Sequence, residues 1–147
     1  MKSISKNRKA FHDYYIEEKI EAGISLTGSE VKVLRLGQGS ISEGYAMIRN
    51  EQAWLIGVYI PTLKHASYQN HTERRERKLL LHRKEINKLD IATRQKGYTL
   101  VPLDLYWDDN NMVKVEIGLA KGKAHHDKRE SEKAKDSRRE IQKALKR

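Results

Sequence analysis

Alternating apolar and polar residues fill most of the first 121 positions, and this pattern predicts a body rich in β-strands. The first example is residues 13–22, where apolar side chains at one parity of position (Tyr14, Ile16, Ile20 and Ala22) alternate with charged ones. That alternation is typical of a half-buried strand, in which successive side chains point to opposite faces. Gly23 follows, and we expect a bend or a bulge there.

Two later pairs of alternating segments predict β-hairpins. Residues 45–49 and 52–60 flank Asn50 and Glu51, which form a plausible two-residue loop. Residues 98–107 and 112–121 flank a polar turn at 108–111, and this is the clearer hairpin. We expect each of its strands to turn one parity of apolar positions to one side: Val101, Leu103 and Leu105 in the first, and Val113, Val115, Ile117 and Leu119 in the second. Pro102 predicts an edge or a bulge, since proline cannot donate to a ladder.

Two segments have the period and the end signals of helices. Thr27 and Glu30 form a T-x-x-E capping box before a short apolar stripe that Gly37 closes. Residues 83–96 carry apolar side chains at helical spacing, and Gly97 follows them. Residues 62–78 form a long polar connection, and a connection of this length in a small domain is usually functional or mobile.

Short antiparallel strands with few helices indicate a mainly β fold, and we expect a small antiparallel barrel resembling the OB fold over residues 11–121. Residues 1–10 are basic and have few apolar partners, so we expect a loose N-terminal arm. Residues 122–147 form a basic C-terminal tail with a helix-forming composition and a thin apolar seam. Because packing stabilises most helices, we expect this tail to be disordered when free and helical when bound.

Charge is concentrated at the C-terminal end of the chain. The formal net charge is +10, and residues 121–147 hold eleven Lys or Arg against five Asp or Glu, a net of +6. Such a balance favours a polyanionic partner, and nothing in the sequence favours a membrane. The chain has no cysteine, no apolar leader and no run long enough to span a bilayer. We therefore expect a cytoplasmic protein.

Catalytic patterns are weak in this chain. It contains no glycine-rich phosphate loop, HExxH or G-x-S-x-G motif. His125, His126 and Asp127 are adjacent, and adjacent side chains seldom converge on one metal ion. Asp108 and Asp109 could be grouped with Asp104 as metal ligands, but turns favour aspartate for backbone reasons. We therefore expect neither an enzyme nor a bound metal or cofactor.

Basic residues mixed with aromatic rings and imidazoles favour binding to a nucleic acid. They occur in three segments, at 6–9, at 74–84 and in the tail. Lysine and arginine neutralise phosphates, whereas aromatic faces stack on unpaired bases. The cluster at 74–78 also contains Glu76 and follows Glu73, so a solvated charged face explains it equally well. Tyr14, Trp54 and Trp107 fit a core better than a stacking surface.

Several segments together resemble the SmpB family, the SsrA-binding proteins of bacteria. They occur in the family's order and cover nearly the whole chain: NRK at 7–9, YYIEEKIEAG at 14–23, GSEVKVLR at 28–35, RKLLLH at 77–82, GYTLVP at 97–102 and GLAKGKAHHDKR at 118–129. The resemblance implies an OB-type barrel that binds the tRNA-like domain of transfer-messenger RNA (tmRNA, or SsrA RNA). It also implies delivery of that RNA to stalled ribosomes for trans-translation, with no bond made or broken by the protein.

The resemblance also assigns residues. Glu21, Leu80 and His82, with Arg35 as a weaker candidate, match the surface that contacts tmRNA. Lys121, Lys123 and the segment His126, Asp127, Lys128 and Arg129 match the part of the tail that contacts the small-subunit rRNA at the decoding centre and mRNA channel. Elongation factor Tu in the delivery complex and a monomeric state are implied too. Glu73 replaces a common proline and Ala124 a common lysine.

Two other functions compete with ribosome rescue. A generic single-stranded RNA-binding OB module would bind unrelated RNAs with similar dependence on salt. A nuclease would degrade RNA in the presence of a divalent metal ion.

Overall fold

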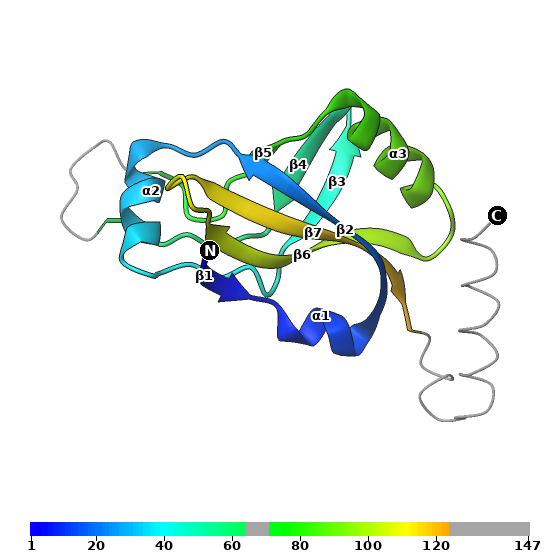
Figure 1. Cartoon of the computed structure of the whole chain (residues 1–147), viewed down its shortest axis with the longest axis horizontal. Helices are drawn as coiled ribbons and strands as arrows, with labels where there is room; N and C mark the ends of the chain where they lie inside the picture. The colour runs from blue at the N-terminus through cyan, green and yellow to red at the C-terminus, as the bar shows by residue number, and fades with distance from the viewer. Residues whose placement is uncertain (64–70, 124–147) are drawn as a thin grey trace.

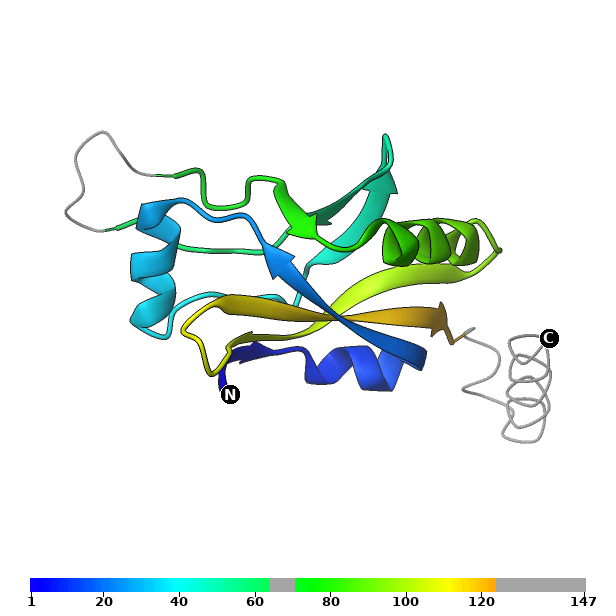
Figure 2. The ribbon, with the colours of Figure 1, turned by 45° about the horizontal axis from the view of Figure 1, so that its top comes forward.

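A computed structural model of the chain describes residues 1–63 and 71–123, and Figure 1 shows its arrangement. The elements follow one another as β1 (Lys2–Lys6), α1 (Arg8–Asp13), β2 (Tyr14–Ile24), α2 (Gly28–Arg35), β3 (Tyr45–Arg49), β4 (Gln52–Ile56), β5 (Arg77–Leu80), α3 (Arg83–Thr93), β6 (Tyr98–Trp107) and β7 (Val113–Gly122). The two views place α2 and α3 at opposite ends of the sheet (Figures 1 and 2). The predicted tail lies outside the described residues, apart from Gly122 and Lys123.

The strands form one antiparallel sheet that closes on itself. Its order is β1-β6-β3-β4-β5-β2-β7, and β7 also pairs with β6. The chain therefore forms a small barrel with β1 added beside β6, as expected from the short alternating strands. The core contains fully buried side chains from both hairpins and from α2, among them Leu34, Leu55, Leu100, Leu105 and Ile117.

Local sequence signals predicted most of these elements correctly. Asn50 and Glu51 both adopt positive φ, 52° and 62°, as a two-residue hairpin turn requires. Thr27 caps α2, and its amide in turn donates to the Glu30 carboxylate at 2.8 Å, which completes the predicted capping box. Strand β4 is central, between β3 and β5, as its two apolar faces indicated.

Two β-bulges divide the apolar residues into two cores, and the predicted faces were wrong on this point. The register shifts between Pro102 and Asp104, so Val101 and Leu103 pack outside the barrel while Leu105 packs inside it. A second shift between Ile16 and Glu18 separates Tyr14 and Ile16 from the interior positions that follow. Alternation alone predicted a single face in each strand, because an extra residue reverses the phase without changing the composition.

The N-terminal segment is not a loose arm. Strand β1 pairs with β6 from Lys2↔Trp107 to Lys6↔Asp104, and Ala10 of α1 covers the outer core. Asn7 is buried between β1 and α1, and it links α1 to β6. Its side-chain amide donates to the Pro102 carbonyl of β6 at 3.1 Å, and its Oδ1 accepts from the Ala10 amide of α1 at 3.2 Å. The segment has few apolar residues of its own, and backbone hydrogen bonds hold it instead.

We expect Asn7→Ala to lower the free energy of unfolding by about 1–3 kcal/mol, because it removes a helix cap and leaves a buried carbonyl unpaired. Urea unfolding followed by circular dichroism measures this change. Asn110→Ala is the matched control, since Asn110 is exposed in the turn between β6 and β7 and only its backbone amide is hydrogen-bonded there. Equal midpoints for the two variants would contradict the anchoring role of Asn7.

The basic cluster at 74–78 is partly structural. Arg77 is fully buried, and its Nε donates to Glu30 Oε2 at 2.5 Å. Arg75 holds the same carboxylate through Nη2 at 2.6 Å, and Glu76 pairs with Arg49 at 2.6 Å. Arg75 and Arg77 therefore form ion pairs within the protein. Neither of the two expected roles for this cluster, a nucleic-acid-binding surface or a solvated charged face, accounts for these two residues.

Candidate nucleic-acid interface

Three of the residues predicted to bind tmRNA line one pocket of about 530 Å³. Glu21 comes from β2, Leu80 from the end of β5, and His82 from the residue that precedes α3. These positions are 61 residues apart in the chain (82 minus 21), and the pairing of Gly23 with Leu80 brings them together. Gln52 of β4 and Lys114 of β7 are among the other residues that line the pocket.

Strand β5 passes close to β2 at Gly23, where a larger side chain would be crowded. A Cβ at Gly23 would lie 3.2 Å from the Leu80 Cβ, closer than ordinary packing allows. A bend or a bulge was expected at Gly23; the register does not shift there, and the bulge of β2 lies between Ile16 and Glu18. Leu80 is 54% exposed and lines the pocket, where its apolar side chain can contact a base or a sugar.

Glu21 is oriented by a residue that sequence reasoning missed. The hydroxyl of the buried Tyr106 donates a hydrogen bond to Glu21 Oε2, across the outer face of the barrel. Burial raises the pKa of Tyr106, and the hydrogen bond to Glu21 raises it further, so the phenol remains a donor at neutral pH. The second carboxylate oxygen, Oε1, has no hydrogen-bond partner among the described residues.

The pocket can therefore offer a carboxylate oxygen, an apolar side chain and an imidazole to one ligand. A carboxylate accepts from base amino or imino groups and from sugar hydroxyls, and it repels phosphate. Lys78 and Lys114 line the same pocket and supply charge for a phosphate nearby. The His82 amide is held by the Glu85 carboxylate at 3.0 Å, so α3 fixes the backbone of His82 and leaves its ring exposed.

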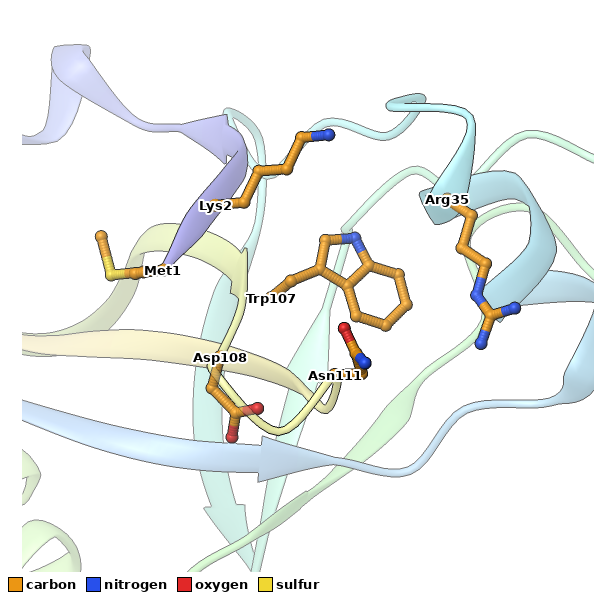
Figure 3. Close-up of a pocket in the computed structure, with 6 residues that line it drawn as sticks. All are labelled: Met1, Lys2, Arg35, Trp107, Asp108 and Asn111. Carbon is orange, nitrogen blue, oxygen red and sulfur yellow. The ribbon is translucent and has the colours of Figure 1, made fainter.

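Arg35, the fourth predicted tmRNA residue, lies elsewhere. It is the last residue of α2, at the end of the sheet opposite α3, and it lines a separate pocket with Trp107 and Asn111 (Figures 1 and 3). Its guanidinium carbon is 5.8 Å from the centre of the Trp107 ring. The two pockets share no lining residue.

The two lysines predicted to contact the ribosome lie where β7 ends. Lys121 donates to the Lys96 carbonyl at 2.5 Å, and its ammonium is 4.7 Å from the centre of the Tyr98 ring. The Lys123 ammonium is 5.1 Å from the Tyr15 ring, and its backbone amide donates to the Asp13 carbonyl at 3.1 Å. These contacts fix the path of the chain through Lys123. His126, Asp127, Lys128 and Arg129 lie outside the described residues.

Within residues 1–63 and 71–123, no group of three or more histidine or acidic side chains could hold a metal ion. In the same ranges, no helix is long and apolar enough to cross a membrane.

The sequence did contain a signal for Tyr106. Leu105 packs in the barrel core, and alternation turns the next side chain, Tyr106, to the outer face together with Lys114, its partner in β7.

The fold and the exposed pockets define a class: an OB-like barrel with basic and aromatic surface sites, as in nucleic-acid-binding domains. The SmpB protein family model matches residues 4–147. An SsrA-binding protein of Caulobacter sp. (strain K31) is 51% identical over 145 residues, covering 99% of this chain and 95% of that protein. Its counterpart in Thermobifida fusca (strain YX) is 51% identical over 146 residues, covering 99% and 91%.

A solved structure gives the same result. It is described as "tmRNA-SmpB: a journey to the center of the bacterial ribosome", and its matching chain is 44% identical with a TM-score of 0.68. The match covers 82% of this chain and 84% of that one. The chain belongs to the SmpB family.

Proposed function

We propose that this protein is a non-enzymatic adaptor that binds the tRNA-like domain of tmRNA and delivers the RNA to stalled ribosomes for trans-translation. Membership of the SmpB family supports this function, since the relatives are SsrA-binding proteins. The observation in the fold that carries it is the pocket in which Glu21, Leu80 and His82 meet. Its carboxylate, apolar and imidazole groups suit one unstacked nucleotide of a folded RNA.

The tail has a different role in this proposal. Lys121 and Lys123 fix the direction in which the chain leaves the barrel, and His126, Asp127, Lys128 and Arg129 contact the decoding centre and the empty mRNA channel. A channel that holds message excludes the tail sterically. Action on the ribosome implies the cytoplasm, with elongation factor Tu in the delivery complex and a single copy of this chain bound.

Glu21→Gln tests the pocket directly. We expect the affinity for the tRNA-like domain RNA to fall by about fivefold, because a hydrogen bond to a charged acceptor is worth about 1 kcal/mol more than one to a neutral amide. Fluorescence anisotropy of labelled RNA at physiological salt measures the dissociation constant.

Glu18→Gln is the matched control. It removes the same charge from the same strand, and Glu18 pairs with Lys88 without lining the pocket. Affinities that stay equal to that of the unchanged protein in both variants would exclude Glu21 as an RNA contact. Equal affinity of the unchanged protein for unrelated RNAs would instead support the generic single-strand-binding module.

A further inference from the structure

Strand β5 is short and lies between β4 and β2 (Figure 2). Its side chains alternate, so that Arg77 and Leu79 point inward and are buried, whereas Lys78 and Leu80 are exposed. Leu80 lines the proposed RNA pocket from this strand. The register of β5 therefore determines which leucine the pocket receives, because a slip of one residue turns every side chain of a strand to the other face.

Backbone pairing and apolar burial specify this register only weakly. Strand β5 has three register pairs with β4 and two with β2. Leu79, Leu80 and Leu81 are consecutive, so the buried position of Leu79 receives a leucine again after a slip of one residue or of two. A slip normally costs free energy because it moves apolar side chains out of the core, and a run of leucines removes that cost.

The other inward position requires a basic side chain of a particular shape. Arg77 and Glu30 are both fully buried, and Arg77 Nε donates to Glu30 Oε2 at 2.5 Å. The other guanidinium nitrogens donate to three backbone carbonyls, those of Val58 at 2.9 Å, Arg75 at 3.2 Å and Glu73 at 3.1 Å. One planar guanidinium thus reaches a carboxylate and three carbonyls together, whereas a lysine has a single nitrogen and cannot replace it.

Each alternative register fails at the position of Arg77. A slip that brings Leu80 inward would place Lys78 beside Glu30 and leave carbonyls unpaired. A slip of two residues in the same direction would place Leu79 there and leave the buried carboxylate without a cation from this strand. The opposite slip would bury Lys78 in the apolar position of Leu79, which is costly for a charge without a partner.

We infer that the buried ion pair of Glu30 and Arg77 sets the register of β5 and thereby positions Leu80 and His82 in the proposed RNA pocket. A buried polar residue fixes the register of coiled coils in the same way, where apolar packing alone permits several alignments. Arg77 does not line the pocket, so it is a positioning residue that acts through the strand. This inference rests on the proposed RNA-binding function and adds a determinant that lies outside the pocket.

Arg77→Lys tests the inference, because it makes residues 77 and 78 identical. The native register and the register slipped by one residue then both place a lysine and a leucine at the two inward positions. We expect the methyl NMR spectrum of the full-length variant to show a second set of signals for the leucines at 79–81. A soluble nitroxide broadens exposed methyl groups, so it distinguishes the native register, with Leu80 outward, from the slipped one, with Leu79 outward.

The affinity for the tRNA-like domain RNA should fall with the population of the native register. Two equally populated registers halve the affinity, so we expect a loss of about twofold or more by fluorescence anisotropy. Arg49→Lys is the matched control, because it makes the same change in a surface ion pair with Glu76, next to the start of β5. It should show one set of leucine signals and unchanged RNA affinity.

Adding Lys78→Glu to Arg77→Lys separates register from stability. In the slipped register this change would place a second carboxylate beside Glu30, and two buried like charges repel each other. A single set of leucine signals should therefore return. The added change restores none of the hydrogen bonds of Arg77, so a purely structural role for Arg77 predicts no such rescue. RNA affinity is not compared for this variant, since Lys78 itself lines the pocket.

Lys78→Arg is the second variant, for the case that Arg77→Lys does not fold. Lys78 is exposed, so this change leaves the native contacts of Arg77 in place. It also offers a guanidinium to Glu30 in the slipped register. We expect a minor second state at the leucines of 79–81, measured by chemical-exchange saturation transfer.

Several results would overturn the inference while leaving the proposed function intact. They are one set of leucine signals in folded Arg77→Lys, a second set that persists when Lys78→Glu is added, or two registers with unchanged RNA affinity. A single state in Lys78→Arg would do the same where Arg77→Lys does not fold. Failure of the unchanged protein to bind the tRNA-like RNA would instead contradict the proposed function, and the leucine spectra would still decide what sets the register.

Discussion

Replacing Glu30 with alanine is expected to lower the free energy of unfolding by about 3–5 kcal/mol, because it leaves the buried Arg77 guanidinium without its counterion. Small domains are stable by about 5–15 kcal/mol in total, so this one change should remove a large part of the stability. Glu30 and Arg77 are both fully buried. The Glu30 carboxylate also accepts from Arg75 and from the Thr27 amide.

The Glu30 carboxylate joins two parts of the chain. It completes the N-terminal cap of α2, and it holds Arg75 and Arg77 at the start of β5. Arg77 in turn donates to the carbonyls of Val58 at 2.9 Å and Glu73 at 3.1 Å. Loss of the carboxylate therefore loosens α2 and the segment that leads into β5 together.

Urea unfolding measures the effect, with Glu76→Gln as the matched control. Glu76 pairs with Arg49 on the surface, so solvent and salt screen that pair and its removal should barely move the midpoint. Glu30→Gln keeps the shape of the side chain and removes only the charge. Equal midpoints for Glu30→Gln and Glu76→Gln would show that the buried carboxylate is not ionised in the folded protein.

The ionisation of Glu30 should make the stability of the fold depend on pH. Burial raises the pKa of Glu30, but hydrogen bonds from Arg75, the Thr27 amide and Arg77 outweigh burial and leave the pKa below its ordinary value. A carboxylate with a lowered folded-state pKa stabilises the fold above its unfolded-state pKa. That stability is lost as the pH falls toward the folded-state value. Unfolding midpoints measured from neutral to acid pH should therefore fall more steeply in the unchanged protein than in Glu30→Gln.

Removing residues 124–147 is expected to abolish tagging of stalled ribosomes while tmRNA binding persists. The proposed RNA pocket lies within the barrel, so affinity for the tRNA-like domain should fall by no more than about tenfold, through lost phosphate attraction. Tagging is measured in a reconstituted translation system with a message that lacks a stop codon. We expect it to drop to the level seen without the protein.

A scrambled tail separates residue order from charge. It keeps the composition of residues 124–147, and hence their net charge, but loses the HHDKR segment at 125–129. If the tail binds the decoding centre through particular side chains, the scrambled protein should be as inactive as the truncated one. Full tagging by the scrambled protein would reduce the tail to a nonspecific polycation. Loss of RNA binding on truncation would place the tail in primary RNA recognition.

Local signals predicted the elements of this fold, and long-range contacts determined what the sequence could not predict. The turn at Asn50 and Glu51 and the cap at Thr27 depend on neighbours a few residues away, so the pattern was sufficient. The strand order depends on pairings between distant segments, such as Lys2 with Trp107, which alternation does not encode. The sequence analysis also did not predict that Arg77 is buried. A basic residue among charged neighbours resembles a surface residue until its partner, Glu30, is located.

Part of the candidate site was likewise predicted from the sequence, and part of it was not. The family resemblance named Glu21, Leu80 and His82, and the pairing of β2 with β5 placed them around one pocket. Trp107 was expected in the core, and it packs against the core in part. Tyr106 was missed because alternation does not show that Glu21, which is distant in the sequence, lies on the same outer face.

The pairing of β1 with β6 has a consequence for synthesis of the chain. Trp107, the partner of Lys2, is made 105 residues after it (107 minus 2). Asn7 likewise binds the carbonyls of Pro102 and Leu103, which do not exist until then. The N-terminal segment must therefore wait, unpaired, through most of translation, and it can dock only after β6 has emerged. Its low apolar content keeps it soluble during that interval, so the same composition that weakens its intrinsic folding protects the nascent chain from aggregation.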